Sequence, residues 1–230
     1  MFLIQTTRAG AVLAVVGCAS SASGGFTTIA PPFDGEVGHE AILESAFGGD
    51  FVASGLDFSN GTITATRVDD DDNQLFEIPV FDAEVEAVFA SLDQTFGYLP
   101  GPSGGDFVTI FDVVGKAFNV TGSVEGLTIA DQPFRFARRG ANGIDSSLDA
   151  DNGGLDKLVT YEITGLDTDA DVTLLFFEDL LGTVKDDDFQ DLVVKVTARP
   201  GTPRPIPNPA ALGAGLVMLG ALMLRRRRTA

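Results

Sequence analysis

The chain has 230 residues, of which 44% are hydrophobic, so it is long enough and apolar enough to bury a sizeable core. Its formal net charge is −18, and all 33 acidic residues lie between Asp34 and Asp191. Residues 24–199 hold nine basic residues, which gives this part a formal charge of −24. Such a surface repels nucleic acid and anionic lipid, so nucleic-acid binding is excluded.

One cysteine, Cys18, and one histidine, His39, are present. They exclude an internal disulfide framework, a cysteine-based zinc site and any metal site that needs two histidines from one chain. No nucleophile elbow accompanies His39, so we expect it to be a partly exposed residue ahead of an amphipathic stretch.

The N-terminus has the layout of a secretory signal peptide. Arg8 precedes an apolar run over residues 9–19, and small residues follow, with spacing that favours cleavage after Ala22. An alternative is that "VVGC" is a lipobox with Cys18 as the acylated residue.

Period-2 alternation dominates the next part of the chain and predicts an all-β, jelly-roll-like antiparallel β-sandwich over residues 23–199. We predict a short helix at "HEAILESAF" and a two-residue hairpin turn at Asn60-Gly61. The predicted strands cover residues 61–68, 82–91, 106–114, 118–126, 134–140, 158–166, 172–180 and 189–198.

The C-terminus predicts a membrane segment. A proline-rich spacer over residues 200–209 precedes 15 apolar residues, 210–224, and the four arginines Arg225, Arg226, Arg227 and Arg228. As a helix the apolar run spans about 22 Å, against a hydrocarbon core of about 30 Å. The arginines place the C-terminus in the cytoplasm and the acidic domain outside.

This tail, residues 206–230, resembles the PEP-CTERM sorting signal of exopolysaccharide-producing bacteria, which is Val-Pro-Glu-Pro followed by an apolar helix and an arginine cluster. Ile206, Pro207, Asn208 and Pro209 stand in the four motif positions, with Asn208 in place of the glutamate. The resemblance implies that an exosortase-type enzyme cuts near the motif and releases or re-anchors the domain at the cell surface. The alternative is an ordinary stop-transfer anchor.

The segment "FFEDLLGTVKDDDFQDLVVKV" resembles a domain-of-unknown-function family of exported bacterial proteins, and residues 48–74 also look like part of such proteins. The family implies a shared β fold without an assigned activity. The matching positions are Phe176, Glu178, Asp179, Leu180, Asp186, Asp188, Phe189, Asp191 and Leu192, with Gln190 in place of an asparagine.

Two acidic constellations offer oxygen ligands for calcium. Asp167, Asp169, Asp171 and Glu178 fall at EF-hand positions, but Val172 stands where the loop needs glycine, so we expect a solvated hairpin turn. In "DDDFQDL" we expect alternation to put Asp186 and Asp188 on one side, with Asp191 close by. Glu178 and Asp179 join them if a hairpin forms around "LGTVK". The alternative is a water-exposed charged hairpin that discourages aggregation.

Three functions compete for the exported domain. The first is a non-enzymatic surface or matrix protein, and the second is a calcium-dependent module that binds extracellular polysaccharide. The third is a glycoside hydrolase, for which paired carboxylates are available. The chain has no tryptophan and two tyrosines, which counts against sugar-stacking platforms and most strongly against the hydrolase.

Overall fold

The computed structural model describes residues 25–32, 35–90, 93–179 and 187–199. These residues form one helix and thirteen strands. In chain order they are α1 (His39–Phe47), β1 (Val52–Ser54), β2 (Asp57–Ser59), β3 (Thr64–Arg67), β4 (Val80–Ala87), β5 (Gln94–Pro100), β6 (Val108–Lys116), β7 (Asn119–Thr121), β8 (Ser123–Thr128), β9 (Phe134–Gly140), β10 (Gly143–Ser146), β11 (Leu158–Thr164), β12 (Val172–Phe177) and β13 (Leu192–Ala198).

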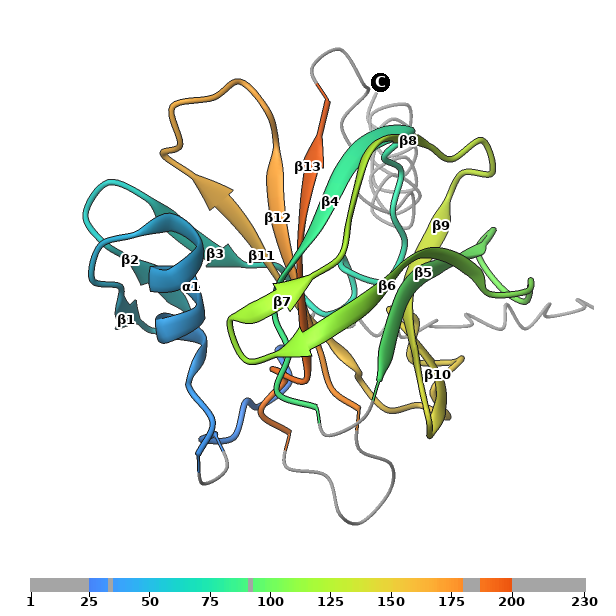
Figure 1. Cartoon of the computed structure of the whole chain (residues 1–230), viewed down its shortest axis with the longest axis horizontal. Helices are drawn as coiled ribbons and strands as arrows, with labels where there is room; N and C mark the ends of the chain where they lie inside the picture. Colours follow the sequence, from blue (N-terminus) through green and yellow to red (C-terminus); the bar gives the residue numbers. More distant parts are fainter. Residues whose placement is uncertain (1–24, 33–34, 91–92, 180–186, 200–230) are drawn as a thin grey trace, which may run out of the picture.

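The strands form two antiparallel sheets (Figure 1). The larger has eight strands in the order β1-β2-β3-β11-β12-β13-β4-β8, and the smaller has five in the order β10-β9-β5-β6-β7. Gly122 alone separates β7 from β8, so the chain passes there from the small sheet to the large one. The sequence prediction of an all-β fold with two antiparallel sheets is confirmed, and the arrangement is consistent with a sandwich.

Phenylalanine rings fill the space between the two sheets. Phe136 of β9 is fully buried, and its ring centroid lies 4.7 Å from that of Phe76, 5.4 Å from Phe96 and 4.9 Å from Phe134. Leu175 and Phe177 of β12 face the same cluster from the large sheet. Aromatic pairs of this kind contribute packing energy beyond the area that they bury.

The opposite face of the large sheet carries a second core, to which α1 contributes. Ile42 and Leu43 of α1 are fully buried there against Leu174 and Phe176 of β12. Successive side chains of a strand point to opposite faces. In β12, Leu175 and Phe177 therefore pack in the core between the two sheets, and Leu174 and Phe176 pack in the second core with α1. Figure 1 shows α1 beside β1, β2 and β3 at one end of this sheet.

The helix predicted at residues 39–47 is confirmed with the same bounds. It ends at Gly48, whose φ of 74° is a conformation that glycine adopts readily, and whose N–H donates to the Glu44 carbonyl. Each predicted strand has a counterpart, although residues 118–126 divide into β7 and β8.

Two details differ from the sequence prediction. Ser59 pairs with Thr64, so the hairpin at Asn60-Gly61 has a four-residue loop rather than a two-residue turn. Strands β1, β2, β5 and β10 were not predicted, because they are short or, in β5, interrupted by glycine and proline ("QTFGYLP").

The predictions for the two ends of the chain lie outside the described residues. They are the signal peptide with Cys18 and its Ala22 cleavage site, the sorting motif at 206–209, and the apolar segment with Arg225–Arg228. Within those described ranges, no helix is long and apolar enough to cross a membrane.

We expect Phe136→Ala to lower the free energy of unfolding by about 3–5 kcal/mol, because a fully buried ring leaves a cavity that its neighbours fill only in part. Chemical denaturation measures the change. The matched control is Phe118→Ala, since Phe118 is 43% exposed; its change should be clearly smaller. Equal losses in both variants would contradict this account of the core.

Candidate carboxylate site

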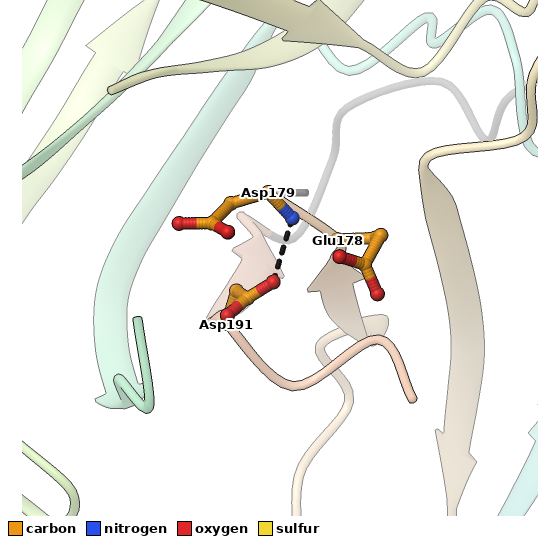
Figure 2. Close-up of side chains that lie close together, drawn as sticks. All are labelled: Glu178, Asp179 and Asp191. Atoms are coloured by element: carbon orange, nitrogen blue, oxygen red, sulfur yellow. Dashed lines mark hydrogen bonds between the residues drawn. The ribbon is translucent and has the colours of Figure 1, made fainter. Parts of the chain in front are cut away.

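Three carboxyl groups meet where β12 ends and β13 begins. Glu178 and Asp179 follow directly after β12, and Asp191 precedes β13. Phe177 pairs with Leu192 in the antiparallel ladder, so the ends of the two strands lie side by side. One oxygen atom from each of the three carboxylates lies within 4.8 Å of the others (Figure 2).

Hydrogen bonds hold two of these groups in place. The backbone N–H of Asp179 donates to Asp191 Oδ2 at 2.6 Å, which is the dashed line in Figure 2. The Gln94 side-chain amide donates to Asp179 Oδ2 at 3.0 Å. Since Gln94 begins β5, the small sheet contributes directly to the site.

Arg138 of β9 connects this site to the small sheet. The side chain is 1% exposed; its Nη1 donates to Gln94 Oε1 at 2.9 Å and its Nε to the Glu178 carbonyl at 3.3 Å. Its Nη2 forms an ion pair with Asp145 of β10. The arrangement is a polar network buried between the two sheets.

Among the residues that the structure describes, the network holds more negative than positive groups. Its four acidic side chains are all buried: Glu178 is 0% exposed, Asp179 5%, Asp191 9% and Asp145 3%. Among the described residues, the two cations beside them are Arg138 and Lys157, each 1% exposed. Burial raises the pKa of Asp145, and the charges of these two cations oppose the rise. If all six groups are ionised, the formal charge is −2. A buried excess of this kind is removed by protons or by a cation.

The protonation of Asp191 reflects this excess. Burial, together with the charges of Asp179 and Glu178, raises the pKa of its carboxyl to about 9. The hydrogen bond from the Asp179 N–H opposes the rise. At neutral pH, without a cation, the cluster of Asp191, Asp179 and Glu178 therefore favours a bound proton over full ionisation.

The donor set suits a hard cation. Calcium binds six to eight oxygen atoms, and three carboxylates provide up to six when each binds through both oxygens. The set contains no histidine or thiolate, so it does not suit zinc or a softer transition metal. The structure brings together Glu178, Asp179 and Asp191 from the sequence-predicted set.

Asp188, also predicted for this site, lies elsewhere. Its Oδ2 accepts a hydrogen bond from Gln190 Nε2 at 2.8 Å, and the same nitrogen donates to Glu36 at 3.0 Å. The predicted alternation fails here because Asp187 and Phe189 have φ angles of 56° and 57°, which are not those of an extended strand. Asp186 lies outside the described residues.

The EF-hand spacing does not correspond to a loop around one ion. Asp167, Asp169 and Asp171 are exposed in the connection between β11 and β12, whereas Glu178 is fully buried at the far end of β12. The expectation of a solvated turn for the three aspartates is confirmed. The alternative of a water-exposed hairpin does not hold for Glu178, Asp179 and Asp191, since these three groups are buried.

Sequence reasoning missed Arg138, Gln94 and Asp145. A signal for Arg138 was present in "FRFARRG", where it has the same parity as Phe134 and Phe136, the two inward-facing rings. A charged residue at an inward position of a buried strand needs a partner of opposite charge. Gln94 carried no comparable signal, because the strand that it begins was not recognised.

His39 is buried, contrary to the expectation of partial exposure; it is 4% exposed. Its Nε2 lies 2.8 Å from the Asp188 carbonyl oxygen and its Nδ1 lies 3.0 Å from the Tyr161 hydroxyl. The ring also packs against Phe176 at 4.2 Å between centroids. His39 thereby joins α1 to β11, β12 and the segment before β13.

Comparison of the chain with protein-family models, with curated proteins and with solved structures found no match.

We expect acid to destabilise the domain through His39. Burial lowers the pKa of its imidazole from 6.5 to about 4, so between these values the unfolded chain binds a proton that the folded chain does not. This contribution to stability is intact above pH 6.5, declines as the pH falls, and reaches a loss of about 3 kcal/mol below pH 4.

Urea unfolding of the wild type and of His39→Gln across this pH range measures the effect. Glutamine keeps a donor for the Asp188 carbonyl but does not titrate. Subtracting the two curves removes the contribution of the carboxyl groups that titrate in both proteins. Parallel curves would contradict the role given to His39.

Proposed function

We propose that this chain is an exported protein of the cell surface or extracellular matrix, with a non-enzymatic structural or interaction role. A signal peptide over residues 1–22 directs export, and an exosortase-type enzyme processes the sorting signal at Ile206–Pro209. Before processing, the apolar segment 210–224 holds the chain in the membrane. The support comes from the two terminal segments together with the charge of −24 between them.

The position of the described domain supports this organisation. Its first helix begins at His39 and its last strand ends at Ala198, so every described element lies between the two predicted targeting segments. The proline-rich spacer starts at Pro200, immediately after the domain. Within the domain, β11, β12 and β13 pair as consecutive antiparallel strands. The jelly-roll-like connectivity stays a prediction.

For the domain itself we propose a structural calcium site at Glu178, Asp179 and Asp191. The carrying observation is the buried excess of negative charge among the described residues. With all six groups ionised its formal charge is −2, which the charge of one divalent cation equals in magnitude. Outside the cell, calcium is available at concentrations that weakly binding extracellular modules use. A cation here ties the end of β12 to the start of β13 and, through Gln94 and Arg138, to the small sheet.

The burial of the site bears on the two alternative functions. Carboxyl groups that are 0–9% exposed cannot contact a polysaccharide chain. If the domain is a polysaccharide-binding module, calcium at this site acts by stabilising the fold and not by contacting the sugar. The same burial gives these carboxyl groups no route to a glycosidic bond, so the cluster does not favour a glycoside hydrolase.

We expect the mature protein from the producing cells to begin near Ser23 and to lack Arg225–Arg228. Mass spectrometry of the two ends measures both points. Replacing the four arginines with neutral residues should weaken membrane orientation and processing, because the cytoplasmic positive charge is lost. A mature chain that keeps its arginines identifies a permanent anchor instead, and a diacylated Cys18 identifies a lipoprotein.

We expect the purified domain to melt at a higher temperature in millimolar calcium than in chelator, because a ligand that binds only the folded state stabilises it. The gain should be lost in Asp191→Asn, in which the amide oxygen still accepts the bond from the Asp179 N–H. The matched control is Asp169→Asn, at an exposed aspartate, which should keep the full gain. An equal gain from magnesium, or from sodium chloride at matched ionic strength, would reduce the effect to charge screening.

A further inference from the structure

Three asparagines are each followed by glycine: Asn60-Gly61, Asn142-Gly143 and Asn152-Gly153. In such pairs the backbone nitrogen of the glycine can attack the side-chain amide carbon of the asparagine, because glycine has no Cβ to obstruct the approach. A Cβ added at any of the three glycines would meet no heavy atom within 4 Å. Space at the Cβ position therefore does not distinguish the three glycines, whereas the hydrogen bonds of the asparagine side chains do differ.

The Asn60 side chain is held at both ends of its amide. Its Oδ1 accepts hydrogen bonds from the backbone N–H groups of Thr62 at 3.0 Å and Ile63 at 2.8 Å. Its Nδ2 donates to the Gly48 carbonyl at 3.0 Å. These partners fix the amide and resist the rotation that ring closure requires.

The Asn152 side chain is held in a similar way. Its Oδ1 accepts from the Ser146 N–H at 2.9 Å, and its Nδ2 donates to the Ser146 carbonyl at 2.7 Å and to the Leu155 carbonyl at 3.3 Å. As with Asn60, all partners are main-chain groups, so the restraint lasts as long as the local fold.

Asn142 differs from both. It is exposed, in the two-residue connection between β9 and β10, where Gly140 pairs with Gly143. Within the described residues its side chain makes one long contact, 3.5 Å from Nδ2 to the Asp179 carbonyl oxygen, and no bond to its Oδ1 is found. One long hydrogen bond restrains this amide less than the three bonds at each of the other two asparagines do, and hairpin tips are places where backbone fluctuations are large.

We propose that Asn142 is a site of spontaneous deamidation in the folded protein. The Gly143 nitrogen forms a bond to the Asn142 side-chain amide carbon and loses its proton to solvent. Nδ2 takes up a proton from solvent, its bond to that carbon breaks, and it leaves as ammonia. The resulting succinimide is hydrolysed by water, which leaves aspartate or isoaspartate at position 142. No oxidant, reductant or enzyme is needed.

The position of Asn142 gives this reaction a consequence. Its Nδ2 is the atom that faces the Asp179 carbonyl, and Asp179 belongs to the buried carboxylate cluster. The product places a carboxylate where a donor stood, so an attraction becomes a repulsion at the edge of a network that already has excess negative charge. An ageing protein would therefore become more acidic beside the cluster. The reaction itself does not depend on calcium.

Incubation of the purified full chain at mildly alkaline pH, followed by peptide mass spectrometry, tests the proposal. We expect the amide-to-acid mass gain at Asn142 well before it appears at Asn60 or Asn152. In denaturant the restraints on the other two disappear, so the three rates should converge. Hydroxylamine, which cleaves the succinimide, should cut the folded chain preferentially after Asn142.

Asn142→Gln provides the control, because the longer glutamine side chain closes a ring much more slowly. In this variant the early mass gain and the early cleavage should both vanish. Equal rates at the three sites in the folded protein, or earlier conversion at Asn60 or Asn152, would overturn the proposal. These readouts follow one covalent bond, so they stand or fall separately from calcium binding and from processing of the chain ends.

Discussion

The pairing of β12 with β13 is the interaction on which the rest of the structure depends. It places Phe176 opposite Val193 and Phe177 opposite Leu192, and all four side chains are 0% exposed. Because both faces of these strands are covered, one by the small sheet and the other by α1, the ladder lies in a low-dielectric interior. Any polar group at its end shares that environment.

The carboxylate cluster is a direct result of this pairing. Glu178, Asp179 and Asp191 flank the last paired residues, so they cannot move apart without breaking the ladder. Three carboxylates in an apolar interior are costly. Among the described residues, Arg138 and Lys157 offset only part of the charge of these three groups and Asp145. The fold therefore holds a charge imbalance in place, and the raised pKa of Asp191 is its electrostatic signature.

The second face of the large sheet depends on a different polar contact. His39 is held in a pocket that lowers its pKa, between Tyr161 and the Asp188 carbonyl. The left-handed backbone at Asp187 and Phe189 directs that carbonyl towards the histidine and turns Phe189 into the core, where it is 1% exposed. The same turn separates the Asp188 carboxylate from that of Asp191.

The sequence alone determined the fold class, the bounds of α1 and most strands, because period-2 and helical periodicities are local properties that survive tertiary context. It also offered Glu178, Asp179 and Asp191 as one cluster on the condition that their two strands pair, and β12 and β13 do pair. Only the tertiary structure decided that the cluster is buried, that Arg138 and Gln94 reach it from another sheet, and that His39 lies inside. Burial depends on what packs over a strand. The long-range contacts, from Gln94 to Asp179 and from Arg138 to Glu178, join residues far apart in the chain. No local pattern encodes either property.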